Sequence, residues 1–139
     1  MTMFVDTSGW IALFDKSDQY FPTAIKHWRE MLNEPLTLLT TDYVLDETLT
    51  HLLYRCGRKV ALQFGHWAFA TSYLEIQFID NEVWQAAWEM FQAYEDKQWA
   101  FTDCTSFIVM QRQQVWQAFS FDPHFEQAGY RLWPGAAGN

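Results

Sequence analysis

Short apolar runs alternate along the chain with longer segments in which apolar residues recur at helical spacing. The runs predict strands at residues 3–5, 36–40, 73–79, within 115–121 and near 130–133. The longer segments predict helices at residues 9–14, up to about 33, 43–55, about 59–71, from 82 onward and from 103 onward. Alternating strands and helices are typical of α/β proteins, so we expect a three-layer sandwich around a mainly parallel central sheet.

An aspartate follows two of the expected strands and precedes a helix. Asp6 follows the apolar residues 3–5, and Asp122 follows the apolar run that ends at Phe121. In open parallel sheets the chemistry lies beyond the carboxyl ends of the strands, where both carboxylates would lie. Each aspartate could instead serve only as the N-cap of the next helix. Taken alone, the two stretches leave both interpretations open.

Further acids lie at the start or on the face of a helix. Asp103 falls in the first turn of a helix for which Thr102 is the expected N-cap, and the helix dipole alone would favour an acid there. Asp46 and Glu47 flank the apolar stripe of the helix at 43–55, and helical spacing does not decide which of them points into a pocket. Because strand ends and helix starts meet at one edge of a parallel sheet, these acids can converge with those that follow the strands.

The net charge of the chain bears on what such a cluster of acids could do. The chain has 17 acidic residues against 9 Lys and Arg, a formal net charge of −8. This sign does not suit a protein that holds nucleic acid by bulk electrostatics. A nucleic-acid enzyme of this charge needs cations between its carboxylates and the phosphates. Hard carboxylate oxygens suit Mg²⁺ or Mn²⁺, which can activate water for attack on a phosphodiester.

Composition and length restrict the remaining possibilities. The 139 residues are half hydrophobic, which predicts one domain over 1–134 and a loose Gly/Ala tail at 135–139. The apolar runs are too short to span a bilayer, and we expect neither a membrane segment nor a signal peptide. Cys56 and Cys104 are far apart, which excludes a cysteine-based zinc site and favours a reducing, cytoplasmic setting.

Two further stretches each allow two interpretations. The first gathers three of the nine basic residues around a helix break: Arg55, Arg58 and Lys59. It is either a solvated turn or an elbow that contacts RNA phosphates. The second is an aromatic stripe at helical spacing: Trp84, Trp88 and Phe91. Such a stripe is most often core, and the alternative is base stacking or a dimer contact.

Four stretches in order carry a family resemblance. They are Phe-Val-Asp-Thr-Ser at 4–8, Glu47 within 43–53, Phe-Thr-Asp at 101–103 and Phe-Ser-Phe-Asp-Pro-His-Phe at 119–125. Together they resemble a PIN-domain ribonuclease of the VapC-like toxin type, over nearly the whole chain. Ser8 is a departure, since many relatives carry Asn there. Thr7 and Ser106 are polar neighbours that could orient a carboxylate or a metal-bound water.

The resemblance implies a PIN-like fold and a Mg²⁺- or Mn²⁺-dependent endoribonuclease. It implies four catalytic and metal-binding acids, which are Asp6, Glu47, Asp103 and Asp122, and it thereby selects Glu47 over Asp46. Relatives of this type are usually paired with a small antitoxin and are often dimeric. The expected partners are therefore an RNA substrate, an antitoxin and a second copy of the chain.

Two other functional classes compete with the nuclease. A phosphoacceptor or phosphatase usually has a second acid next to its strand-end aspartate, or a late-strand lysine. Here Thr-Ser follows Asp6, and no basic residue lies between Arg112 and Arg131, which disfavours this class. A catalytically idle PIN-fold binding or dimerisation module is the second class. The presence of all four acids argues against it, and a divalent-metal titration would separate it from a nuclease.

Overall fold

A five-stranded parallel sheet forms the centre of the computed structural model, which describes residues 1–134. The strands are β1 (Thr2–Val5), β2 (Thr37–Thr41), β3 (Leu74–Gln77), β4 (Gln117–Ser120) and β5 (Arg131–Pro134). They lie in the order β3-β2-β1-β4-β5, and every neighbouring pair runs parallel. The expected α/β sandwich is confirmed, and the described sheet is entirely parallel rather than mainly so. The tail expected at 135–139 lies outside the described residues.

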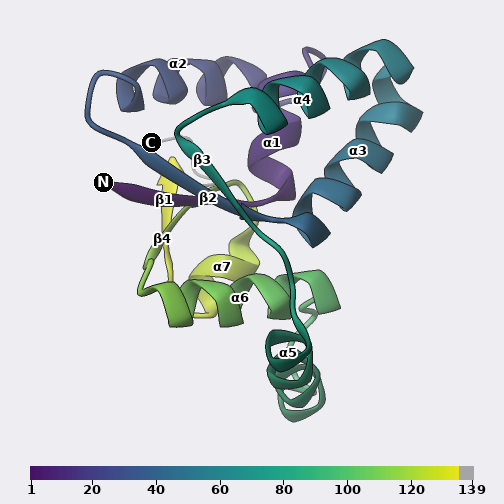
Figure 1. Cartoon of the computed structure of the whole chain (residues 1–139), viewed down its shortest axis with the longest axis vertical. Helices are drawn as coiled ribbons and strands as arrows, with labels where there is room; N and C mark the ends of the chain where they lie inside the picture. Colours follow the sequence, from purple (N-terminus) through teal and green to yellow (C-terminus); the bar gives the residue numbers. More distant parts are fainter. Residues whose placement is uncertain (135–139) are drawn as a thin grey trace.

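Helices cover the sheet on both faces (Figure 1). On one side lie α1 (Thr7–Phe14), α2 (Phe21–Met31) and α4 (Arg58–Ala70), and on the other lie α5 (Asn81–Ala93), α6 (Phe101–Gln113) and α7 (Pro123–Gln127). The helix α3 (Asp42–Cys56) leaves the end of β2 and packs against α4, forming a hairpin that projects from the sheet edge. Among the described residues, no helix combines the length and the hydropathy needed to cross a bilayer.

The central strand β1 explains why its sequence is apolar without alternation. Met3, Phe4 and Val5 are all buried because helices cover both faces of the sheet. On one face Trp10 packs against the rings of Phe64 and of other aromatic residues from α2 and α4. On the other face Phe4 stacks with Phe125 of α7. The short strands are therefore held by large aromatic contacts on both sides.

The starts of two helices differ from the expectation. Asp80, one residue earlier than predicted, caps α5, because its carboxylate accepts a hydrogen bond from Val83 N at 2.9 Å. The N-cap of α6 is Ala100 rather than Thr102, so Asp103 becomes the third residue of that helix. From there its Oδ2 accepts a hydrogen bond from Ala100 N at 3.0 Å, as the last residue of a capping box does.

The third strand is shorter than predicted, since β3 covers Leu74–Gln77 rather than 73–79.

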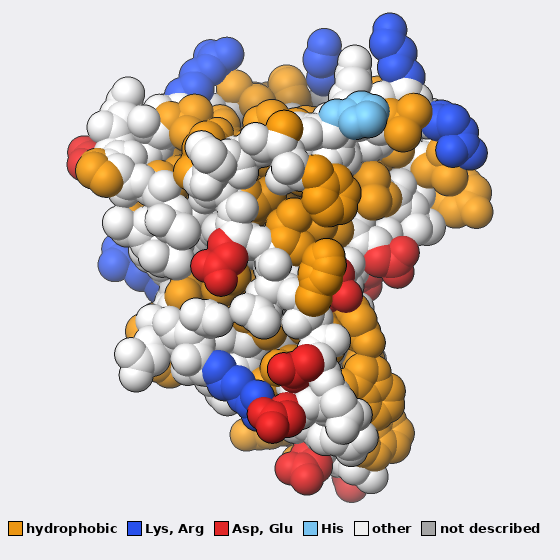
Figure 2. Space-filling model, in the orientation of Figure 1, with side chains coloured by type: hydrophobic (Ala, Val, Ile, Leu, Met, Phe, Trp, Pro, Cys, Tyr) orange, Lys and Arg blue, Asp and Glu red, His pale blue; other side chains and the backbone are white. Residues whose placement is uncertain are grey.

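The aromatic stripe of α5 lies on the surface, so its interpretation as core is wrong. Trp84, Trp88 and Phe91 are 38%, 41% and 43% exposed. Their rings stack on one another in sequence, and Figure 2 shows an orange band of hydrophobic side chains over α5. Helical spacing is the same for a stripe that faces the core and for one that faces a partner. The stripe therefore remains available for an interface.

Candidate active site

The first site residue, Asp6, both caps a helix and lines a pocket. Its Oδ1 accepts a hydrogen bond from Gly9 N at 2.9 Å, which caps α1, so the helix-cap interpretation is confirmed. Gly9 is required at this start because a Cβ atom there would lie 2.3 Å from the carbonyl oxygen of Phe119. The close approach brings α1 against β4 and places the Asp6 carboxylate between the two elements. Capping and a site role are therefore compatible in one side chain.

Two hydroxyl groups hold the carboxylate of Asp6 in place. Ser8 Oγ donates to Oδ1 at 2.8 Å, and Ser120 Oγ donates to Oδ2 at 2.9 Å. Ser8 thus fills a positioning role at the point where the chain departs from many relatives. Asp6 is only 4% exposed, and its burial raises its pKa to about 7, although the hydrogen bonds from Gly9, Ser8 and Ser120 act in the opposite direction. A buried carboxylate that has no cationic partner among the described residues and lies near Asp122 gains from a bound cation.

Asp103 and Asp122 come from different elements and meet through a histidine. Asp103 lies in the first turn of α6, and Asp122 caps α7 by accepting from His124 N at 2.9 Å. The Nδ1 atom of His124 lies 3.2 Å from Asp103 Oδ2 and 3.2 Å from Asp122 Oδ1. Burial raises the pKa of Asp103 to about 6. One ligand atom from each of these three residues lies within 4.8 Å of the others, a spacing that could hold a metal ion.

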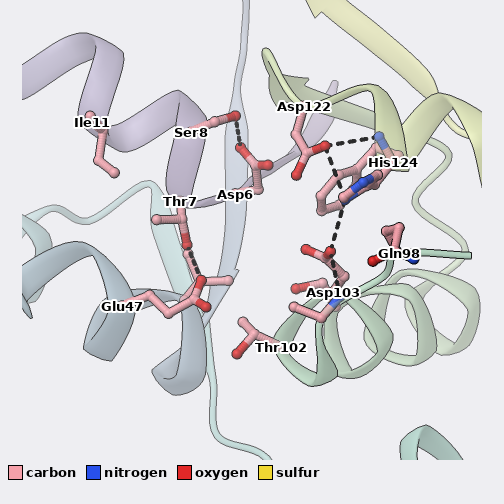
Figure 3. A pocket seen from close by; sticks show the side chains of 14 residues that line it. Asp6, Thr7, Ser8, Ile11, Glu47, Gln98, Thr102, Asp103, Asp122 and His124 are labelled. Atoms are coloured by element: carbon pink, nitrogen blue, oxygen red, sulfur yellow. Dashed lines mark hydrogen bonds and ion pairs between the residues drawn. The ribbon is translucent and has the colours of Figure 1, made fainter. Parts of the chain in front are cut away.

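Glu47 lies across the pocket from this group, on α3 (Figure 3). Thr7 Oγ1 donates to Glu47 Oε1 at 2.7 Å and fixes the side chain at the pocket wall. Asp46 does not line this pocket. The structure thus separates two adjacent acids that helical spacing alone could not separate.

The four predicted acids surround one pocket of about 320 Å³. In Figure 3 their carboxylates face a common space from β1, α3, α6 and the start of α7. The hydroxyl of Ser106 also lines this pocket, and its Oγ is buried and has no hydrogen-bond partner among residues 1–134. Carboxylate oxygens are the ligands that Mg²⁺ and Mn²⁺ prefer, and a hydroxyl beside them can hydrogen-bond a metal-bound water. The residues present therefore fit a divalent cation.

Sequence reasoning missed three contributors to this site. His124 was part of a recognised motif, yet nothing in the spacing showed that its ring would lie between Asp103 and Asp122. Ser120 ends β4, a common place for a polar residue, and its contact with Asp6 spans 114 positions. Gly9 could have been found, because a glycine just inside a helix start is unusual without a close backbone approach.

The predicted RNA-contacting residues lie elsewhere. Arg55 is in the last turn of α3, and Arg58 and Lys59 begin α4 after Gly57, whose φ is +95°. All three side chains are exposed, and none of them lines the acidic pocket. They stand at the tip of the α3–α4 hairpin (Figure 1).

Comparison with known proteins places the chain in a family. The PIN domain matches residues 3–129. The 23S rRNA-specific endonuclease VapC20 of Mycobacterium tuberculosis is 32% identical over 128 residues, which cover 92% of this chain and 95% of that protein. A VapC ribonuclease of Archaeoglobus fulgidus is 34% identical over 90 residues, covering 63% of this chain and 55% of that one.

Solved structures agree with the sequence matches. The crystal structure of VapC20, described as a sarcin–ricin loop cleaving toxin, superposes with a TM-score of 0.85 at 30% identity, covering 92% of this chain and 95% of the other. VapBC2 from Rickettsia felis, bound to a promoter DNA fragment, superposes with a TM-score of 0.69 at 12% identity, covering 95% and 97%, and shares the fold alone. The resemblance inferred from the four sequence stretches is confirmed, and the relatives are VapC endoribonucleases of toxin–antitoxin systems.

Proposed function

The chain belongs to the PIN domain family, and from this premise we propose that it is a Mg²⁺- or Mn²⁺-dependent endoribonuclease, the toxin of a toxin–antitoxin pair. One observation carries the proposal. Four carboxylates from four separate elements line one pocket together with an unpartnered hydroxyl. A binding module without catalysis would not need this arrangement, since like charges around one pocket repel one another.

The proposed roles follow from the contacts. Asp6, Glu47, Asp103 and Asp122 hold the cation, which when bound polarises the phosphodiester and lowers the pKa of an attacking water. The two serines around Asp6 and the hydroxyl of Thr7 fix two of these carboxylates in orientation. His124 bridges Asp103 and Asp122 and keeps the two acids close while no cation is present. Ser106 offers a hydrogen bond to a water in the pocket.

The substrate proposal rests on the relatives. VapC20 is a 23S rRNA-specific, sarcin–ricin loop cleaving enzyme, so a stem-loop of this kind is the first RNA to test. We expect cleavage of a synthetic sarcin–ricin stem-loop in Mg²⁺ or Mn²⁺ and none in chelator. Cleavage that persists unchanged in chelator would reject metal dependence, and no cleavage of this stem-loop, 23S rRNA or total cellular RNA in either metal would reject the nuclease.

We assign contacts with the RNA phosphates to the tip of the α3–α4 hairpin. Changing Arg55, Arg58 or Lys59 singly to Ala should weaken RNA binding for all sequences alike. It should also lower the salt slope of binding by about one unit, because each basic side chain that contacts a phosphate displaces about one counterion. Titrations of RNA at several salt concentrations measure both effects. Arg29→Ala on α2 is the matched control and should change neither. An unchanged slope in the triple variant would leave these residues as a solvated turn.

The aromatic stripe of α5 is assigned to a homodimer contact. Trp88 lies in the middle of three exposed, mutually stacked rings. A dimer contact would bury these rings, and Trp88→Glu would then place a charge at the centre of the interface. We expect a dimer for the wild type and a monomer for Trp88→Glu in sedimentation experiments at micromolar concentration. Phe69→Glu on α4, also exposed, should remain dimeric. A monomeric wild type would contradict the assignment.

The remaining partner is a small antitoxin in the cytoplasm. The acidic pocket attracts a basic side chain when it holds no metal, so the antitoxin should supply a Lys or Arg there or otherwise block access. A neighbouring gene for a small DNA-binding protein, and its ability to stop cleavage when added to the purified chain, provide the test.

A further inference from the structure

A second hollow borders the acidic pocket and runs along α3. Thr7 and Glu47 line both, so the two spaces are continuous at the catalytic acids. Beyond Glu47 the hollow follows one face of the helix past His51 and Tyr54 to Arg55, and its volume is about 640 Å³. Glu47, His51 and Tyr54 are four and seven residues apart along α3 and therefore lie on one helix face.

Tyr54 is the most unusual residue of this hollow. It is 82% exposed, the highest value among the exposed large hydrophobic side chains. The Cα atom of Tyr54 lies about 10 Å along the helix axis from that of Glu47, since seven residues rise 1.5 Å each. That separation corresponds to about three stacked nucleotides. A free aromatic face at this distance from the catalytic acids is suited to hold a base while the backbone reaches the pocket.

Charge changes sign along the hollow. Asp46 and Glu47 lie at the catalytic end, and Arg55 lies at the outer end, followed by Arg58 and Lys59 at the start of α4. Figure 2 shows Lys and Arg side chains gathered over the tip of the α3–α4 hairpin. The sugar–phosphate backbone of RNA fits this gradient. The basic side chains at one end attract phosphate, and the acidic pocket at the other end attracts it once a cation is bound. Every lining residue carries a polar or ionisable group beside apolar carbon, a combination that suits the bases and phosphates of a nucleic acid.

We propose that this hollow is the base-binding part of the RNA site: a nucleotide of single-stranded or loop RNA stacks on Tyr54, with His51 beside it and its phosphate toward Arg55. The proposal rests on the proposed nuclease function and adds a substrate-positioning residue that makes no metal contact. It also predicts a preference for loops over duplexes, because only an unpaired base can lay its face on the ring.

Fluorescence anisotropy with a labelled single-stranded RNA of mixed sequence, in chelator so that cleavage cannot occur, tests the proposal. Tyr54→Ala should weaken binding about tenfold, within the range that base stacking contributes, and leave the salt slope unchanged. Tyr54→Phe keeps the ring and should bind within about twofold of the wild type. Phe69→Ala, an exposed aromatic on α4, is the control and should match the wild type.

The proposal would be overturned by wild-type RNA affinity in Tyr54→Ala, whether or not antitoxin or dimer association is lost, and by an equal loss of affinity in Phe69→Ala. The proposed function fails separately. Tyr54-dependent RNA binding without cleavage in Mg²⁺ or Mn²⁺ would keep the hollow as an RNA site and reject the nuclease. Cleavage with the same KM in wild type and Tyr54→Ala would keep the nuclease and reject the hollow.

Discussion

Asp103→Asn should lower the rate of RNA cleavage by at least about 100-fold, the scale on which single electrostatic groups act in active sites. The substitution removes one charge from the pocket at nearly constant volume. The Asn side-chain oxygen can still accept from Ala100 N, which donates to Asp103 Oδ2 at 3.0 Å, so the start of α6 is preserved. The loss should therefore appear in kcat rather than in the folded fraction. Initial rates on the cleaved RNA, together with melting curves, measure both.

Asp46→Asn is the matched control for this loss. It removes the same charge from an exposed acid that does not line the acidic pocket, so kcat should stay near the wild-type value, whereas any effect of its place in the hollow along α3 would appear in KM. Glu47→Gln, one residue away, should lose activity as Asp103→Asn does. Full activity in Glu47→Gln combined with a dead Asp46→Asn would mean that the assignment of the two acids on α3 is inverted.

Asp6→Asn should make the metal-free protein more stable than the wild type, an unusual result for a buried polar residue. Burial raises the pKa of Asp6 from 3.8 to about 7, so the folded state resists its ionisation. Near pH 8 the raised pKa lowers the free energy of unfolding by up to about 4 kcal/mol, at 1.36 kcal/mol for each pKa unit. Asn removes the charge, and its oxygen can still accept from Gly9 N and cap α1.

The pH dependence of this gain has a definite sign. Well below pH 3.8 the carboxyl group is protonated in both the folded and the unfolded state, so Asn and Asp should give similar stability. As the pH rises from 4 to 7 the unfolded state releases its proton first, and the wild type loses stability relative to Asp6→Asn. Asp103, whose pKa burial raises to about 6, remains in both proteins and largely cancels in the comparison.

Melting curves in chelator and in millimolar Mg²⁺ or Mn²⁺ test this prediction. The cation binds the folded wild type and should stabilise it more than Asp6→Asn, in proportion to the logarithm of saturation. If Asp6 were only a helix cap, its replacement would not raise stability, and the cation would shift both proteins equally. A mutant no more stable than the wild type at pH 8 in chelator, with an undiminished metal response, would exclude Asp6 from the metal site.

The sequence could predict those site residues whose position depends on local structure. Asp6 and Asp122 each follow an apolar strand, and the carboxyl ends of parallel strands share one edge. The apolar run at residues 3–5 also identified a buried strand, because burial on both faces leaves no alternation, and the structure places that strand at the centre of the sheet. These features depend on neighbours in the chain, which the sequence displays directly.

Other features depended on how elements pack. Helical spacing could not separate Asp46 from Glu47, because the choice depends on the angle at which α3 leaves β2. The position of His124 between two carboxylates requires α6 and α7 to lie side by side. The surface position of Trp88 could not be read from its spacing, since core and interface stripes have the same period. Tertiary geometry decides each of these points.

Calorimetric titration with Mn²⁺ tests the central claim most directly, because it requires neither RNA nor an antitoxin. The claim is that Asp6, Glu47, Asp103 and Asp122 form one divalent-cation site. The wild type should bind Mn²⁺, each single amide variant of the four acids should bind at least about tenfold more weakly, and Asp46→Asn should bind as the wild type does. Unchanged binding in the four variants, or an equal loss in Asp46→Asn, would contradict the claim.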